Sequence, residues 1–183
     1  MNTIAFDFDD VVCDITLAFL KFNQDYYGVN VDFNSLGDNV YKSLGITSNE
    51  ENNRWNQFFQ NKTYAYPNPK TNILDFFLRL KEKYKLILVS ARKKIWQYQL
   101  RNWLDKYMKG IFDQVIFLDS PENRGKSKAK ICEINNCFLL IDDEPRHIEG
   151  CLKTKVKGVL FNQPWNKNYA KDVIRISSIL ELS

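Results

Sequence analysis

The sequence has little of what marks a membrane protein or a disulfide-rich one. No apolar run approaches the roughly 18 residues that a membrane-spanning helix needs. The first residues show no cationic segment followed by an apolar one, which is the pattern of a secretory signal. The four cysteines lack the C-x-x-C spacing that is typical of metal sites; they are Cys13, Cys132, Cys137 and Cys151. We therefore expect a cytoplasmic protein with reduced thiols and no membrane partner.

Charge of either sign is not concentrated in any part of the chain. The net charge is +4 and no block of like charge occurs, so we expect no stable nucleic-acid partner. A mild positive charge remains compatible with an anionic small molecule. With 44% hydrophobic and 26% charged residues, the composition is that of a globular protein, and 183 residues are enough for one core with a modest insertion.

Histidine is nearly absent, which limits the available acid–base chemistry. The single histidine, His147, follows "DDEP" in a short polar segment, and we expect it at the surface or behind the site rather than in catalysis. A serine hydrolase built on Ser90 would need a G-x-S-x-G turn, and "LVSAR" has neither glycine. The remaining candidates for chemistry are carboxylates.

A short apolar run near the N-terminus ends in three carboxylates. Residues 4–6 fit a buried strand, and Asp7, Asp9 and Asp10 follow where a sheet would pass into a loop. Side chains two residues apart in a strand leave the same face, so Asp7 and Asp9 would repel each other unless a cation lay between them. Hard carboxylate oxygens favour Mg²⁺. The alternative is an acidic turn after an edge strand.

Residues 15–70 differ in character from the rest of the chain. An amphipathic helix with Asp14 as its N-cap and Gly28 at its end follows the acidic strand, and Ser48 and Glu51 have the spacing of a capping box. Strand-like runs are missing here, and we interpret the region as a small helical insertion. Most of its aromatic side chains should form its own core, while some could stack on a flat ligand; the candidates for stacking are Phe19, Trp55 and Phe59.

From residue 72 onward, helical and strand-like segments alternate. The expected helices are 73–83, 95–107 and 128–135, and the expected strands are 86–89, 115–118, 138–141 and 156–161. Such alternation is typical of an α/β fold with a parallel sheet, right-handed crossovers and helices on both faces. Ligands bind such sheets at the carboxyl ends of the strands. We therefore expect four polar side chains that follow strands to meet at one edge: Asp7, Asp9, Ser90 and Asp142.

Four short segments occur in the order found in the haloacid dehalogenase-like (HAD) hydrolase superfamily, which the chain resembles over nearly its whole length. They are "DFDDV" from Asp7, "LVSAR" around Ser90, "GKSKAK" around Lys128 and "LLIDDEP" around Asp142. The early insertion, "LLIDDEPRHIEG" and "LFNQPWNKNY" are more narrowly similar to the 5'(3')-deoxyribonucleotidase family. The resemblance implies a Rossmann-like three-layer core in residues 1–14 and 71–183 and a small helical cap in residues 15–70.

The resemblance also implies a role for each motif residue. Asp7 would attack phosphorus, and Asp9 would act as general acid and base. Mg²⁺ would be held by Asp7, the Asp9 carbonyl and Asp142, while Asp143 would support these ligands or replace one of them. Phosphate oxygens would be bound by Ser90 and Ala91, and a lysine would neutralise the transferring group.

Two features of the motifs leave alternatives open. Asp10 stands where the superfamily often has glycine, so its side chain either caps the loop or points away from it. Three lysines alternate at Lys126, Lys128 and Lys130. We choose Lys128 for the site because it would begin a helix and because its spacing from Asp142 is common in the superfamily.

The leading hypothesis is a Mg²⁺-dependent phosphatase with a deoxyribonucleoside monophosphate as its expected substrate and the cap as a lid. One alternative keeps the chemistry but changes the substrate to another small phosphomonoester or a nucleic-acid phosphate end. Another is a non-catalytic phospho-acceptor module for signalling or binding, but its acceptor Asp would follow a middle strand, and residues 88–90 contain none. The sequence leaves the base, the sugar, the phosphate position and the pathway open, and the aromatic cap offers a surface for a homodimer.

Overall fold

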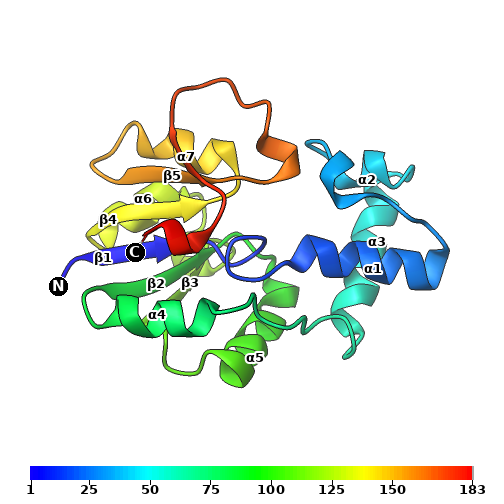
Figure 1. Ribbon diagram of the computed structural model, residues 1–183, viewed down its shortest axis with the longest axis horizontal. Coiled ribbons are helices and arrows are strands. Elements are labelled where there is room, and N and C mark those ends of the chain that lie inside the picture. Colours follow the sequence, from blue (N-terminus) through cyan, green and yellow to red (C-terminus); the bar gives the residue numbers. More distant parts are fainter. Residues whose placement is uncertain (183) are drawn as a thin grey trace.

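The computed structural model describes residues 1–182, and its centre is a single parallel sheet. The six strands lie in the order β3-β2-β1-β4-β5-β6, and each neighbouring pair is parallel (Figure 1). They are β1 (Thr3–Phe6), β2 (Lys85–Ser90), β3 (Gln114–Phe117), β4 (Cys137–Asp142), β5 (Lys157–Phe161) and β6 (Ile174–Ile176). The expected parallel α/β fold is confirmed, and β6 is a strand that the sequence pattern did not predict.

Helices cover both faces of the sheet and give the fold three layers. Phe6 of β1 packs on Phe77 of α4 with ring centroids 5.1 Å apart, whereas the preceding Ala5 lies in the cluster that contains Cys132 of α6. Successive strand residues leave opposite faces, so each strand here contributes to two cores. The α-helices are α1 (Ile15–Tyr27), α2 (Val40–Ser43), α3 (Ser48–Gln60), α4 (Ile73–Lys81), α5 (Gln97–Tyr107), α6 (Lys128–Ile134) and α7 (Pro145–Cys151). The short 3₁₀ helices are η1 (Phe33–Ser35), η2 (Lys94–Trp96), η3 (Pro121–Asn123), η4 (Pro164–Asn166) and η5 (Ile179–Leu182).

Helices α1, α2 and α3, together with η1, form a layer beyond the carboxyl ends of the strands, to the right in Figure 1. We call this layer the cap. Its helices surround their own apolar cluster, in which Phe19 and Phe58 are completely buried. The two chain segments that connect the cap to the sheet are joined, because Lys70 Nζ lies 2.9 Å from Asp14 Oδ1. Within residues 1–182, no helix is long and apolar enough to cross a bilayer.

The start of α1 differs from the sequence expectation. Asp14 occupies the N-cap position, but its side chain makes no capping hydrogen bond. The hydrogen bonds that cap the N-terminus of α1 are made by Asp10 instead. Its Oδ1 accepts from Thr16 N at 2.9 Å, and its Oδ2 accepts from the Thr16 hydroxyl at 2.5 Å. In α3 the capping residue is Thr47, one residue before the Ser48 that the spacing suggested. Loop conformation between β1 and α1 decides which carboxylate reaches the helix, and periodicity carries no information about it.

A buried arginine joins the two long helices of the cap. The Arg54 side chain, in α3, donates to Asn23 Oδ1 in α1 at 2.9 Å and to Glu50 Oε1 at 2.9 Å. Its guanidinium also lies over the Tyr27 ring, 3.8 Å from the centroid. Because Asn23 is completely buried, Arg54 supplies a hydrogen bond that water cannot replace.

Replacing this arginine should destabilise the protein more than breaking an exposed ion pair in the same layer. Arg54→Met keeps an apolar stem but leaves Asn23 Oδ1 without its donor, so the free energy of unfolding should fall by about 1–3 kcal/mol. Lys21→Ala removes an exposed pair with Asp25 and should change it by less than about 1 kcal/mol. Urea denaturation followed by circular dichroism measures both. Equal effects of the two substitutions would contradict this role of Arg54.

Candidate active site

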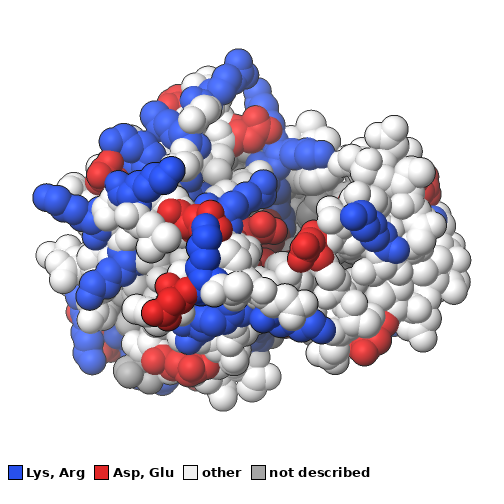
Figure 2. Space-filling model, turned by 90° about the horizontal axis from the view of Figure 1, so that it is seen from above, with Lys and Arg blue, Asp and Glu red and all other residues white. Residues whose placement is uncertain are grey.

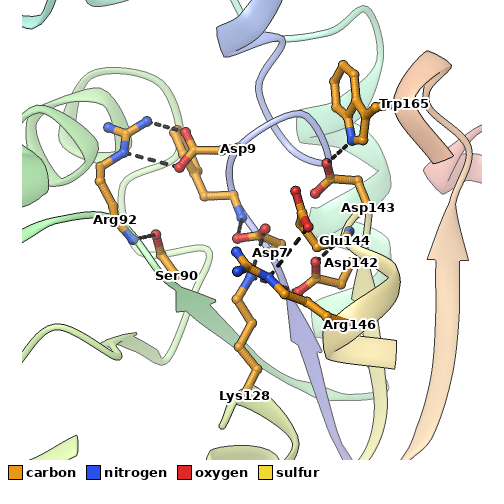
Figure 3. Close-up of polar contacts among 11 residues, drawn as sticks. Asp7, Asp9, Ser90, Arg92, Lys128, Asp142, Asp143, Glu144, Arg146 and Trp165 are labelled. Atoms are coloured by element: carbon orange, nitrogen blue, oxygen red, sulfur yellow. Dashed lines mark hydrogen bonds and ion pairs between the residues drawn. The ribbon is translucent and has the colours of Figure 1, made fainter. Parts of the chain in front are cut away.

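The sheet brings carboxylates from two neighbouring strands to one edge. Phe6 of β1 pairs with Ile141 of β4, so the next residues, Asp7 and Asp142, lie side by side where the strand order switches direction. Figure 3 shows these side chains together with Asp143. Asp142 is completely buried, and Asp7 and Asp143 are nearly so. This is the convergence that the strand pattern predicted.

One lysine lies between two of these carboxylates. Lys128 Nζ is 2.7 Å from Asp7 Oδ2 and 2.7 Å from Asp142 Oδ2, and its side chain is buried (Figure 3). It is the first residue of α6, whose N-cap Ser127 accepts from Lys130 N. The flanking lysines lie elsewhere: Lys126 donates to the Glu122 carbonyl, and Lys130 pairs with Glu133 at the surface. Of the three alternating lysines, Lys128 therefore contacts the carboxylates.

The single positive charge of Lys128 does not offset the cost of burying three carboxylates in their ionised form. Burial raises the pKa of Asp7 to about 8, and the nearby Lys128 ammonium only partly opposes this. Burial, followed by the charges of Asp142 and Asp7, raises the pKa of Asp143 well above its usual range. For Lys128, burial lowers the pKa, but the negative charges of Asp142 and Asp7 outweigh it and the net shift is upward. One ammonium thus faces three carboxyl groups.

The arrangement fits a hard divalent cation. Asp7, Asp142 and Asp143 each offer an oxygen, and these oxygens lie within 4.8 Å of one another. A cation here would add the charge that Lys128 alone does not supply. Asp142 is held in place by the Glu144 N–H, which donates to its Oδ1 at 2.9 Å. The expected ligands Asp7 and Asp142 therefore lie together, and Asp143 belongs to the same group of side chains.

The Asp9 carboxylate has a different partner. The Arg92 guanidinium donates to both of its oxygens, through Nε at 3.2 Å and through Nη2 (Figure 3). Arg92 is itself buried and lies over the rings of Phe8 and Phe59, at 5.2 Å and 4.8 Å. This pairing fixes the direction of the Asp9 side chain. The sequence left two roles open for Arg92, which closes the "LVSAR" motif: a phosphate contact or a pair with an acidic neighbour. The structure has the pair, with Asp9 as the neighbour.

The proposed phosphate-binding residues occupy different depths at the end of β2. Ser90 is completely buried, and its hydroxyl accepts from Arg92 N at 3.1 Å. Ala91 is exposed and lines the cavity described below. The Ser90 hydroxyl thus shapes the turn that carries Ala91 and Arg92.

Asp10 has a backbone role that explains its presence in place of glycine. Its φ of 61° lies in the left-handed region, which aspartate tolerates better than most residues. The carboxylate caps α1, and its burial raises the pKa of Asp10 to about 7. The Asp10 carbonyl accepts from Gln163 Nε2 at 2.6 Å. The sequence had left open whether this side chain caps the loop or points away; in the structure it caps the first turn of α1 instead.

A cavity of about 400 Å³ lies between the carboxylates and the cap. Asp7, Asp9 and Lys128 line one side, and Trp55 and Phe59 of the cap line another. Figure 2 shows a hollow between the core, whose surface carries many charges on this face, and the cap, which carries few. The third stacking candidate, Phe19, does not line the cavity; it is completely buried and stacks on Trp55 with centroids 3.7 Å apart.

His147 lies at the cavity wall, and its buried Nε2 has no hydrogen-bond partner within the part of the chain that the structure describes. Burial lowers the pKa of His147 to about 4, so the ring is neutral at pH 7. The structure thus places His147 in the wall of the cavity, whereas the sequence predicted a position at the surface or behind the site.

No protein-family model and no curated protein matches this sequence. Similar solved structures exist. A haloacid dehalogenase-like hydrolase from Streptococcus pneumoniae has 17% identity and a TM-score of 0.70, with 100% of this chain and 96% of that one covered. A protein assigned as a phosphoglycolate phosphatase from Lactobacillus plantarum has 17% identity, a TM-score of 0.67 and coverage of 100% and 98%. A Bacillus subtilis structure assigned as a HAD hydrolase and bound to magnesium has 18% identity, a TM-score of 0.59 and coverage of 99% and 96%. The chain therefore has the fold of the haloacid dehalogenase-like hydrolases.

Proposed function

We propose that the protein is a Mg²⁺-dependent phosphomonoesterase in which Asp7 is the nucleophile. The observation that carries this proposal is the position of Lys128 between Asp7 and Asp142, with Asp143 beside them and a cavity above. A bound cation would neutralise these carboxylates and polarise a phosphate oxygen. Similar folds include one assigned as a phosphatase and one bound to magnesium, which supports the reaction class and the metal.

The residues of the site divide the reaction into two displacements. In the first, an Asp7 carboxylate oxygen forms a bond to phosphorus, the bond to the leaving oxygen breaks, and Asp9 gives that oxygen a proton. In the second, Asp9 takes a proton from water, the water oxygen attacks phosphorus, and Asp7 is released as phosphate leaves. Lys128 stabilises negative charge on the transferring group. Arg92 holds Asp9 at the edge of the cavity.

The aromatic residues that line the cavity favour a substrate with a flat leaving group. Trp55 and Phe59 line the cavity, and Trp96 joins them from η2 of the core. Such a wall suits a nucleobase, and together with the sequence resemblance it favours a deoxyribonucleoside monophosphate as substrate. The alternative is another small phosphomonoester, since the Lactobacillus plantarum structure is assigned to phosphoglycolate. The cavity leaves the choice of base and of 5' or 3' phosphate open.

Phosphate release from a substrate panel tests this proposal. The panel should contain deoxyribo- and ribonucleoside 5'- and 3'-monophosphates, a 5'-phosphorylated oligonucleotide, phosphoglycolate and sugar phosphates, each with Mg²⁺ and with EDTA. Release that needs Mg²⁺ and is fastest with deoxynucleotides is the expected result. Faster phosphate release from another phosphomonoester would support the phosphatase reaction but contradict a deoxynucleotide as the substrate. No metal-dependent release from any compound would contradict the proposed function and favour a phospho-acceptor module.

Asp7→Asn should abolish turnover while the fold remains intact. An amide cannot take the place of the attacking carboxylate, so kcat should fall by several powers of ten. Initial rates with the best substrate of the panel measure the loss, and circular dichroism checks the fold. The matched control is Asp113→Asn, which changes an aspartate that bonds the Leu86 N–H far from the carboxylate cluster. Appreciable turnover by folded Asp7→Asn protein would exclude Asp7 as the nucleophile.

The metal-free protein should lose stability as pH rises from about 6.5 to 8. Burial raises the pKa of Asp7 to about 8 and of Asp10 to about 7, whereas unfolded aspartates titrate near 4. The folded state then holds protons that the unfolded state has lost, so the free energy of unfolding falls with pH. His147 opposes this fall only weakly and only in the lower part of the window, because the unfolded histidine, with a pKa of about 6.5, loses most of its proton by about pH 7.5.

Urea denaturation midpoints at pH 6.5 and pH 8 measure how steeply the free energy of unfolding falls with pH. Mg²⁺ should make the slope smaller, because a cation on Asp7 replaces the proton, and it should raise the midpoint at pH 8. Asp143→Asn should weaken this effect of Mg²⁺. A stability that rises between pH 6.5 and 8 in EDTA would show that the carboxyl groups are not protonated in the folded protein.

A further inference from the structure

The segment after β5 is attached to the candidate metal site by two side chains. Trp165 Nε1 donates to Asp143 Oδ2 at 2.9 Å (Figure 3). Asn166 Nδ2 donates to the Asp143 carbonyl at 2.7 Å. Both residues belong to η4, which is separated from Asp143 in the sequence by α7 and β5. The hydrogen bonds engage the side chain and the backbone of the same aspartate, so η4 restricts both its position and its orientation.

The backbone of η4 is itself firmly supported. Gln163 and Asn166 form a reciprocal capping box, and Pro164 is the first residue of the turn. Arg175 of β6 donates to Asn166 Oδ1 at 2.8 Å and to Asn162 Oδ1 at 2.7 Å. The indole of Trp165 therefore projects from a rigid turn, which is what a side chain needs if it is to orient another one.

Trp165 also contacts the cap. Its ring meets that of Phe33 in η1 edge to face, with centroids 5.9 Å apart. Packing against Phe33 needs only an aromatic ring, which phenylalanine would supply equally well. The indole N–H has a separate use, since it donates to a buried carboxylate. The two contacts can therefore be separated by substitution.

We propose that Trp165 is a positioning residue that orients the Asp143 carboxylate for a divalent cation held with Asp7 and Asp142. This inference deepens the proposed function and rests on its metal. The indole occupies one carboxylate oxygen and fixes the plane of the group, while the cluster places an oxygen of each carboxylate within 4.8 Å of the others. Trp165 also lines the cavity, but the role proposed for it is exerted through Asp143.

Direct metal binding tests the inference without a need for turnover. Mn²⁺ is titrated into the metal-free protein, and free Mn²⁺ is measured by electron paramagnetic resonance. Trp165→Phe keeps the ring against Phe33 but removes the N–H, and its Kd for Mn²⁺ should be about tenfold higher or more. Phe33→Leu removes the contact with the cap but leaves the hydrogen bond, and its Kd should equal that of the wild type. Unchanged Mn²⁺ affinity in folded Trp165→Phe protein would overturn the inference.

A second pair of variants covers the case in which Trp165→Phe does not fold. The variants are Trp165→Gln and Trp165→Leu. Glutamine and leucine side chains are similar in size to each other, and only glutamine carries an N–H donor. Glutamine should bind Mn²⁺ more tightly than leucine if the donor orients Asp143. Equal affinities would again overturn the inference.

Kinetics separate this inference from the proposed function. In Trp165→Phe, the Mg²⁺ concentration for half-maximal phosphate release should rise by the same factor as the Kd, and kcat at saturating Mg²⁺ should recover. A loss of kcat that saturating Mg²⁺ does not restore would contradict a positioning role. If the wild type binds Mn²⁺ but hydrolyses no phosphomonoester, the proposed function fails while the Mn²⁺ titrations still decide the role of Trp165. If the wild type binds no Mn²⁺, the inference fails whatever the enzyme hydrolyses.

Discussion

The rest of the site depends on the cost of burying three carboxyl groups beside a single ammonium. Charges taken out of water are expensive unless they are paired and hydrogen-bonded, and Lys128 pairs with only two of the three. The chain supplies further hydrogen bonds from the backbone of Phe8 to Asp7 and from that of Glu144 to Asp142. Without a cation, the raised pKa values of Asp7 and Asp143 mean that protons on the carboxyl groups lower this cost. A bound cation would replace those protons and add the positive charge that an anionic phosphate needs in the same small volume.

The position of this cluster follows from the strand order, and its enclosure follows from the cap. The order in which the strands are added reverses between β1 and β4, and this leaves a crevice at the carboxyl edge, as it does in other open parallel sheets. The side chains that the cap contributes to this crevice include the aromatic Trp55 and Phe59, which would shield a leaving group from part of the bulk water. Asp10 connects the two parts: its side chain begins the first cap helix, and its carbonyl is bound by Gln163 of the core. A change in the cap can thus reach the loop that carries Asp7 and Asp9.

Much of the core could be predicted from the sequence, because each of its features is local. Apolar runs indicated the sheet, and polar residues at strand ends indicated the edge where Asp7 and Asp142 lie. The choice of Lys128 among three lysines used helix position and motif spacing. The contacts that sequence reasoning missed join distant segments: Trp165 binds Asp143, and the short strand β6 supports η4 through Arg175. For Arg92 the sequence allowed a pair with an acidic neighbour but did not identify Asp9 as that neighbour. Periodicity predicts which face a side chain leaves, but not which partner it meets there. For the same reason Phe19, an aromatic residue at the right helical spacing, lies behind Trp55 rather than in the cavity.

The most direct measurement is to map the phosphoryl group on the chain during turnover. Protein mixed with Mg²⁺ and the best phosphomonoester of the panel is quenched in acid, reduced with borohydride and analysed by peptide mass spectrometry. Two displacements at Asp7 predict that the peptide containing residues 4–12 carries the modification, and that Asp7 is the altered residue. If the protein releases phosphate under the same conditions while Asp7 stays unmodified, the nucleophile is not Asp7 and the proposed chemistry is wrong.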